Sequence, residues 1–200
     1  MLFRRVLTIL AAGVLMCGAA TSLAQTPSAS PKAAKSTAKP DAAKPPPAMS
    51  GGAEPTLIGQ FGTWGAYTAT PNGKKVCFAL AKPASSKTNP PNRPRDPAYA
   101  FVSTRPAEKV SNEVSVMIGY TLKPGSESTL EVGGASFSMY TQGDGLWIKN
   151  AAEEAQMIET MRKGSDLVVK SESARGTKTT DTYSLKGIAQ ALDKVAEECR

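Results

Sequence analysis

The sequence lacks histidine entirely and contains only three cysteines among 200 residues. Without histidine, the chain cannot form the Ser-His and Cys-His pairs that activate nucleophiles, nor any metal site built on imidazole. A glycine-rich phosphate loop is also missing, because Gly133-Gly134 and Gly143-Asp144-Gly145 fit turns. These absences exclude triad-type enzymes and histidine-based metalloenzymes, and they predict a protein with neither a metal nor a cofactor.

Long apolar runs are scarce too, and the single example lies near the amino terminus. It extends from Val6 to Ala20, which is shorter than the roughly 20 residues that cross a bilayer as a helix. Arg4 and Arg5 precede this run, and small residues follow it up to Ala24. Residues 1–24 are therefore predicted to be a secretory signal peptide, cleaved after Ala24. Retention of the run as a membrane anchor is the alternative.

The three cysteines become two once the signal peptide is removed, because Cys17 lies within it. Lipid attachment at Cys17 is an alternative, which Met16 disfavours because a lipoprotein signal requires a small residue there. Cys77 and Cys199 remain, and an even number of cysteines in an oxidising compartment predicts a disulfide. Two buried reduced cysteines are the alternative. The bond would close a loop of 122 residues (199 − 77) and so restrict the unfolded chain.

Residues 25–56 have a composition that is typical of a disordered tether. They consist almost wholly of Ala, Pro, Ser, Lys, Thr and Gly, with no aromatic residue and no apolar periodicity, so they cannot bury a core. Pro45-Pro46-Pro47 favours a locally extended piece. The favoured interpretation is a spacer without a partner. A second hypothesis is peripheral association with an anionic membrane surface or wall polymer, since the tether is mildly basic.

Residues 57–200 are long enough for one domain with its own core. Their charge is nearly balanced, with 18 Lys and Arg against 15 Asp and Glu. No basic stripe alternates with aromatic residues, so the sequence argues against a nucleic-acid partner. It carries no signal for an oligomeric state.

Short β-type runs dominate this domain. Asn72-Gly73 and Gly143-Asp144-Gly145 are tight-turn signals that favour antiparallel pairing of adjacent runs. A mainly β fold follows, and this number of short strands predicts a two-sheet antiparallel sandwich. The runs that carry β-branched or aromatic residues between turn signals are 61–68, 75–80, 99–104, 113–120, 129–132, 136–141, 146–149, 166–172 and 177–183.

Two short helices are expected within the β pattern. The first begins at Asn150, a capping residue, with Glu153 completing a capping box, and it ends at Gly164. The second begins near Ser184 and runs to the carboxyl terminus. Its apolar residues recur at helical spacing, which places Cys199 on the core-facing side: Ile188, Leu192, Val195 and Cys199. The alternation of residues 75–80 sets Cys77 on one face with Ala79, so the disulfide would fix the terminal helix to this strand.

Carboxylate pairs are the remaining catalytic option, since two acids can perform glycoside cleavage. Three acids lie in the first predicted helix, and we interpret them as helix-dipole and surface residues: Glu153, Glu154 and Glu159. Asp181 lies inside a predicted strand and needs a partner, for which Arg175 and Lys178 are the nearby cations. A surface ion pair on an edge strand is the favoured interpretation. No residue is predicted to be catalytic.

Residues 82–96 form a long predicted loop rich in proline, with four cations against the single acid Asp96. Its prolines limit the entropy lost on docking, and its arginines could bind phosphate or carboxylate groups in two-pronged fashion. A solvated connector is the favoured interpretation of this loop, and a binding loop is the alternative. The candidate binding surface consists of Arg93, Arg95, Arg105, Arg175, Lys178 and Asp181. The aromatic residues Trp64, Trp147, Tyr67 and Tyr140 are predicted to fill the core rather than line a ligand groove.

The domain resembles the invasion associated locus B family of exported proteins from Gram-negative bacteria. The segments that carry the resemblance are Trp64, Lys75-Val76-Cys77, 101–106 (FVSTRP), 112–115 (NEVS), 147–154 (WIKNAAEE), 161–165 (MRKGS) and 173–187 (SARGTKTTDTYSLKG). The resemblance implies an immunoglobulin-like β-sandwich in the periplasm or associated with the outer membrane. Some members are implicated in host-cell invasion. It supplies no catalytic residues.

The preferred hypothesis is therefore a non-enzymatic envelope protein that binds an envelope or host protein, a glycan or an anionic envelope component. The alternative is a carboxylate-dependent periplasmic hydrolase or a small-ligand carrier. A pocket with two inward carboxylates would favour the hydrolase, and an arginine-bearing surface over a solid core would favour the binding protein.

Overall fold

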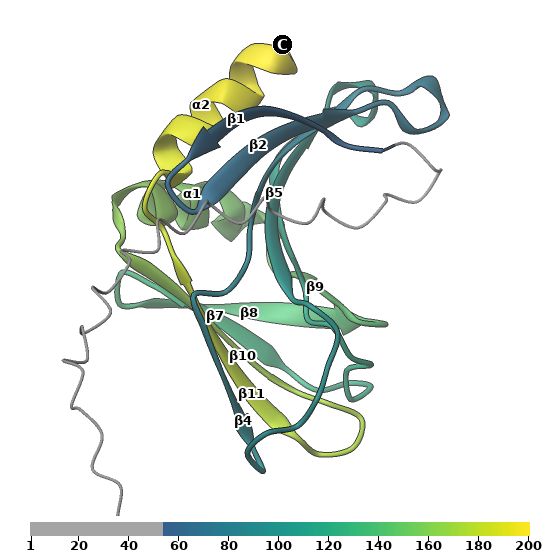
Figure 1. Ribbon diagram of the computed structural model, residues 1–200, viewed down its shortest axis with the longest axis vertical. Helices are drawn as coiled ribbons and strands as arrows, with labels where there is room; N and C mark the ends of the chain where they lie inside the picture. The colour runs from purple at the N-terminus through teal and green to yellow at the C-terminus, as the bar shows by residue number, and fades with distance from the viewer. Residues whose placement is uncertain (1–53) are drawn as a thin grey trace, which may run out of the picture. The chain divides into compact units, whose positions relative to one another are not determined.

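The computed structural model describes residues 54–200, which form eleven strands and two α-helices (Figure 1). The predicted signal peptide and nearly all of the predicted tether lie outside the described residues. The strands are β1 (Thr56–Phe61), β2 (Trp64–Ala69), β3 (Val76–Ala81), β4 (Ser85–Asn89), β5 (Tyr99–Arg105), β6 (Val110–Met117), β7 (Ser128–Val132), β8 (Ala135–Gln142), β9 (Gly145–Ile148), β10 (Asp166–Glu172) and β11 (Lys178–Ser184). The helices are α1 (Glu154–Lys163) and α2 (Ile188–Glu198).

All eleven strands belong to one antiparallel sheet, in the order β1-β2-β3-β5-β6-β9-β8-β7-β10-β11-β4. The prediction of a mainly β fold with two helices, one of them C-terminal, is confirmed. The two separate sheets of the predicted immunoglobulin-like sandwich are not found. The short strand β9 is the reason, because Trp147 pairs with Ser115 of β6 on one side and with Tyr140 of β8 on the other. The hydrogen-bonded ladder therefore continues where a sandwich would have two free edges.

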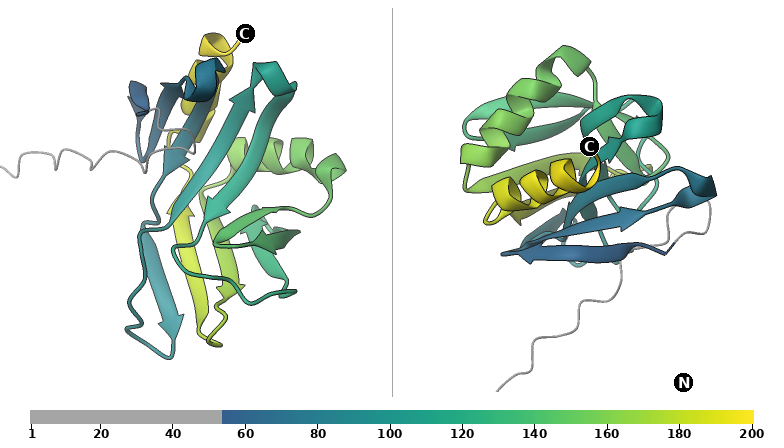
Figure 2. Two further views of the ribbon diagram at one scale, coloured as in Figure 1. Left: turned by 90° about the vertical axis from the view of Figure 1, so that its right-hand side faces the viewer. Right: turned by 90° about the horizontal axis from the view of Figure 1, so that it is seen from above.

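The sheet bends until strands from its two ends lie together. Trp64 at the start of β2 donates its indole N–H to the carbonyl of Ser184 at the end of β11, at 2.9 Å. The segment from β3 to β4 is short, so the chain passes directly from the third strand of the sheet order to the last (Figure 2). Both ends of the sheet therefore contribute to one core.

The main core lies inside this bend, where both helices pack. Small residues of β3 let α2 approach the sheet closely, and α2 lies against β1, β2 and β3 in both figures. Each fully buried Val or Leu side chain contributes roughly 1.5–3 kcal/mol. The largest side chains with almost no exposure include Trp64, Phe78, Tyr183, Leu167 and Leu192. None of the helices in residues 54–200 is long and apolar enough to cross a membrane.

The predicted disulfide is present and joins Cys77 of β3 to Cys199 after α2, with 5.9 Å between the Cα atoms. An ion pair lies beside it, with Lys75 Nζ 2.7 Å from Glu198 Oε1. The faces predicted from alternation and helical spacing are also observed, since Cys77 and Ala79 share the main core with Val195. The terminal helix is thus fixed to the sheet by a covalent bond at its last turn.

Part of the predicted loop at residues 82–96 is a strand instead. β4 pairs along its whole length with residues 178–182 of β11, with Ser86 opposite Asp181. Its side chains are polar and mostly exposed, so it shows none of the apolar alternation that marks the other strands. Backbone pairing with β11 holds it in place. As a consequence, β11 is an interior strand of the sheet, not the edge strand expected around Asp181.

Candidate functional site

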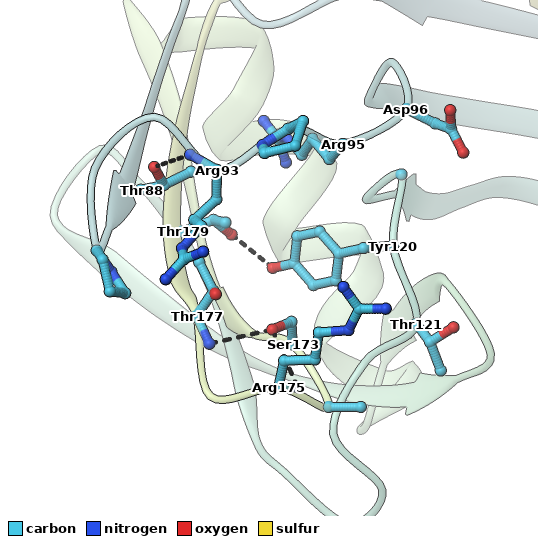
Figure 3. Close-up of a pocket in the computed structure, with 14 residues that line it drawn as sticks. Thr88, Arg93, Arg95, Asp96, Tyr120, Thr121, Ser173, Arg175, Thr177 and Thr179 are labelled. Atoms are coloured by element: carbon cyan, nitrogen blue, oxygen red, sulfur yellow. Dashed lines mark hydrogen bonds between the residues drawn. The ribbon is translucent and has the colours of Figure 1, made fainter.

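A cavity of about 800 Å³ opens where three segments meet at one end of the bent sheet (Figure 3). The segments are the connection from β4 to β5, the connection after β6, and the turn between β10 and β11. We call this cavity the arginine pocket. Its polar and charged lining residues are Thr88, Arg93, Arg95, Asp96, Tyr120, Thr121, Ser173, Arg175, Thr177 and Thr179.

The base of the arginine pocket is an ion pair between Arg95 and Asp181. Nη1 of Arg95 lies 2.7 Å from Oδ2 of Asp181, and Nη2 donates to Oδ1. The same guanidinium also donates to the carbonyl of Ile118 at 3.0 Å and to the hydroxyl of Ser86 at 2.9 Å. The Asp181 side chain is completely buried and that of Arg95 is 11% exposed. The expectation of a surface ion pair on an edge strand is therefore wrong, because β4 pairs beyond β11 and makes β11 an interior strand.

Three hydroxyl groups form a closed triangle beside this pair. Tyr120 lies 2.8 Å from Ser171 and 2.7 Å from Thr179, and the two smaller hydroxyls are 2.9 Å apart. Buried polar groups of this kind are stable because each has a partner. Tyr120 and Thr179 also line the pocket, so the triangle supplies fixed hydroxyl oxygens at its wall.

Backbone hydrogen bonds hold the two outer arginines in position. The hydroxyl of Ser173 accepts the backbone N–H of Arg175 at 3.3 Å and that of Thr177 at 3.0 Å, which fixes the turn between β10 and β11. The backbone N–H of Arg93 donates to the hydroxyl of Thr88 at 3.3 Å. Figure 3 shows the side chains of Arg93 and Arg175 entering the pocket from different walls.

The two outer guanidinium groups have no acidic partner within the described part of the chain. Every ion pair within residues 54–200 involves other cations, and Arg93 and Arg175 take part in none. Asp96 is the single acid that lines the pocket, whereas the charge of Arg95 is already matched by Asp181. The pocket therefore presents two free cations to a ligand. An incoming anion would complete the charge-assisted hydrogen bonds that these groups can form.

The structure brings four of the six predicted site residues together. Arg93, Arg95 and Arg175 line the arginine pocket, and Asp181 lies beneath it. Lys178 is exposed in the sheet opposite Glu172 and is not part of the lining. Arg105 lies elsewhere, 2.7 Å from Glu108 and paired with Glu113. The residues selected from the sequence did not include Tyr120, Ser171, Ser173 and Thr179. Ser171 and Thr179 had one signal, their place among the polar residues of β10 and β11, whereas Tyr120 and Ser173 follow β6 and β10 and had none.

A second cleft of about 600 Å³ lies between β6, β8, β9 and the start of α1, and we call it the aromatic cleft. It contains two carboxylates, Glu113 and Glu154. Oε1 of Glu154 accepts the backbone N–H of Val114 at 2.8 Å. Burial raises the pKa of Glu154, and the nearby charge of Glu113 raises it further. Glu154 was interpreted from the sequence as a helix-dipole residue, and its contact with β6 was not expected.

Tyr140 and Trp147 also line the aromatic cleft. The prediction that all four singled-out aromatics fill the core is correct for Trp64 and Tyr67, which are buried. It is wrong for Tyr140, which is 46% exposed, and Trp147 is only partly buried. Their strands turn alternate residues outward, and no element of residues 54–200 covers them. Residues 54–200 as a whole include no cluster of acids, cysteines or histidines that could hold a metal ion.

Comparison with known protein families matches residues 64–196 to the family described as "Invasion associated locus B (IalB) protein". This region contains the strands from β2 onward, both arginine-bearing walls of the pocket and the aromatic cleft. No curated protein and no solved structure matches the chain.

Proposed function

The chain belongs to the invasion associated locus B family, and from this premise we propose that it is a non-enzymatic envelope protein that binds an anionic group in the arginine pocket. The observation that carries the proposal is the arrangement of Arg93 and Arg175. Among residues 54–200 neither guanidinium group has an acidic partner, and both lie near the Arg95–Asp181 pair, whose own charges already cancel. A guanidinium can bind carboxylate, sulfate or phosphate through two parallel hydrogen bonds.

The chemistry of the arginine pocket supports binding rather than catalysis. The chain has no histidine, and Cys77 and Cys199 are joined to each other, so no activated thiol or imidazole is present in the described residues. Asp181 accepts two hydrogen bonds from Arg95, which occupies both of its oxygens. A bound anion would therefore meet donors and no free general base other than Asp96.

The proposed location is the periplasm or the outer membrane, after cleavage of the signal peptide near Ala24. The sequence pattern of residues 1–24 supports export. The disulfide supports it as well, because such bonds persist in oxidising compartments. The proposed partner is an anionic component of the envelope, or an envelope or host protein or glycan that carries such a group.

Cosedimentation with outer-membrane vesicles from a Gram-negative bacterium tests this function. We expect the wild-type protein to pellet with the vesicles, and less so as ionic strength rises. The double variant Arg93→Gln with Arg175→Gln should bind about tenfold more weakly or worse, since one charge-assisted hydrogen bond is worth roughly 1.5–3 kcal/mol. The matched control is Lys74→Gln with Lys186→Gln, which removes two exposed cations outside the pocket. Equal losses for both double variants would refute the proposal.

The aromatic cleft favours a second candidate, a carboxylate-dependent glycoside hydrolase. Two carboxylates line it, Glu113, which is paired with Arg105, and Glu154, whose pKa is raised by burial, and a pair of acids is the constellation that glycoside cleavage uses. Turnover of chromogenic glycosides that is abolished by Glu154→Gln would favour the hydrolase over the binding protein. We expect no turnover.

A further inference from the structure

The aromatic cleft contains an aromatic pair on the outer face of the sheet, away from the main core. Tyr140 of β8 and Trp147 of β9 are directly opposite each other in register. Their ring centroids are 5.7 Å apart and the ring planes differ by 23°, so the two faces are nearly parallel. On its other side Trp147 is opposite Ser115, whose small side chain leaves the ring uncovered. The result is an open aromatic surface across two neighbouring strands.

Gly145 sets the position of the indole ring. Residues two apart in a strand share a face, and a Cβ on Gly145 would lie 2.3 Å from Cη2 of Trp147. The ring therefore folds back along its own strand over the glycine, where any other residue would collide with it. Packing of an aromatic ring over a strand glycine is a stabilising arrangement in sheets. Packing over Gly145 therefore holds the Trp147 ring in one orientation before any ligand binds.

A comparable pair elsewhere in the sheet is covered. Tyr67 folds over Gly65 in the same way and stacks on Phe78, with ring centroids 5.4 Å apart. Tyr67 is only 8% exposed and Phe78 is completely buried, because further apolar side chains surround them. Tyr140, in contrast, remains 46% exposed. Leaving large apolar surface in water is unfavourable, so an uncovered and pre-positioned pair points to a binding surface.

The polar groups that border the aromatic pair together supply donors and acceptors of hydrogen bonds. They are Lys109, Ser111, Glu113, Gln142 and Glu154. The lining contains one cation, Lys109, and two carboxylates, so its formal charge is negative by one and disfavours an anionic ligand. The volume of about 600 Å³ lies within the roughly 300–1,000 Å³ that is usual for small-ligand sites.

We propose that the aromatic cleft binds an uncharged saccharide. A pyranose ring has an apolar C–H face that fits against an aromatic ring, and a border of hydroxyl groups that both donate and accept hydrogen bonds. The aromatic pair would contact the C–H face, while the carboxylates, Gln142 and Lys109 would bind the hydroxyls. A proline-rich peptide would also suit aromatic rings, but it offers carbonyl acceptors and few donors for the remaining acceptor positions of the two carboxylates. This site shares no residue with the arginine pocket, so it goes beyond the proposed function.

Tryptophan fluorescence provides the test, because Trp64 is completely buried and Trp147 is the accessible one of the two tryptophans. The probes are a panel of uncharged oligosaccharides with gluco, galacto, manno and N-acetylglucosamine units, each titrated into the millimolar range, and a proline-rich decapeptide. We expect at least one saccharide to change the emission saturably. Tyr140→Ala should weaken that binding about tenfold, whereas Tyr140→Phe, which keeps the ring, should preserve it.

Two controls make the outcome specific to the cleft. Leu57→Ala removes an equally exposed apolar side chain, 51% exposed on β1, and should leave saccharide binding unchanged. The Arg93→Gln and Arg175→Gln double variant should leave it unchanged as well, which separates this site from the arginine pocket. The proposal is overturned if no saccharide in the panel binds, if only the peptide binds, or if Tyr140→Ala and Leu57→Ala have equal effects.

Discussion

Arg95 and Asp181 form a two-pronged ion pair that joins the connection before β5 to the middle of β11. The two residues are 86 apart in the chain, and Arg95 lines the arginine pocket while the completely buried Asp181 lies beneath it. It closes the base of the pocket and fixes the segment that carries Arg93. The two unpaired arginines therefore act from a rigid support, which limits the entropy lost when a ligand binds.

Asp181→Asn should destabilise the protein strongly. The substitution leaves the Arg95 guanidinium mostly buried without its counter-charge, and breaking a buried pair by removing one partner costs about 3–5 kcal/mol. Urea unfolding, followed by tryptophan fluorescence, measures this cost. Asp166→Asn, at an exposed acid of β10, is the matched control and should change the free energy of unfolding little. Similar values for the two variants would show that the pair does not support the pocket.

The buried position of Asp181 shows why its role was not evident from the sequence. An acid within a polar strand predicts an exposed edge, and the residues of β11 fit that pattern. The structure differs because β4 adds to the sheet beyond β11. β4 is polar and proline-flanked, so periodicity could not identify it. The partner was also hidden, because Arg175 and Lys178 are near in sequence while Arg95 becomes near only through folding.

Removing the disulfide should lower stability without changing the fold of the sheet. Cys77→Ser with Cys199→Ser frees a loop of 122 residues, and the loss of a native disulfide typically costs about 2–5 kcal/mol. Chemical unfolding with and without reductant measures the effect. Reductant should destabilise the wild type and leave the double variant unchanged. An intact-mass measurement that finds two alkylated thiols in the untreated wild-type protein would contradict the bond itself.

Tyr183→Phe should leave the protein as stable as the wild type or stabilise it by about 1 kcal/mol. The Tyr183 side chain is completely buried, and its hydroxyl has no hydrogen-bond partner in the described residues. Burial raises its pKa and the charge of Asp181 raises it further, so the hydroxyl stays protonated. Phenylalanine keeps the ring packing and removes a group whose desolvation is uncompensated. A loss above about 1 kcal/mol in thermal unfolding would show that the hydroxyl has a partner.

Glu154 should make stability depend on pH in a predictable direction. Burial raises its pKa above the ordinary value of about 4.3, so the folded state retains a proton that the unfolded state has lost. The contribution of Glu154 to the free energy of unfolding therefore declines as pH rises from its ordinary pKa, that of the unfolded state, through the raised pKa of the folded state. Glu154→Gln keeps an acceptor for the backbone N–H of Val114 and lacks this titration.

Thermal unfolding of both proteins across this pH range isolates the effect, because all other groups are shared. The variant should gain stability relative to the wild type as pH rises, and the difference should become constant above the raised pKa. A difference that stays constant throughout, or that changes in the opposite direction, would show that Glu154 is not desolvated.

Most local elements could be predicted from the sequence, except β1 and β4, whereas their assembly into one sheet could not. Asn150 caps the short 3-10 turn at Ala151–Glu153 that leads into α1, and the apolar spacing around Leu192 identifies α2, because these signals act over a few residues. The joining of the sheet through β9 depends on pairings between distant strands. The same limit applies to the sites. Arg93 and Arg95 could be selected as candidates. The exposure of Tyr140 could not be predicted, because it depends on which strands are covered by other elements in the folded protein.

The most direct test of the central claim is an NMR titration that observes the arginine Nε–Hε resonances while inorganic pyrophosphate is added. We expect saturable shifts for Arg93 and Arg175, a small response from Arg95 at the base, and none from Arg162, which pairs with Asp193 on the helices. Shifts of equal size at Arg93, Arg175 and Arg162, or no saturation at any of them, would contradict an anion site in the arginine pocket.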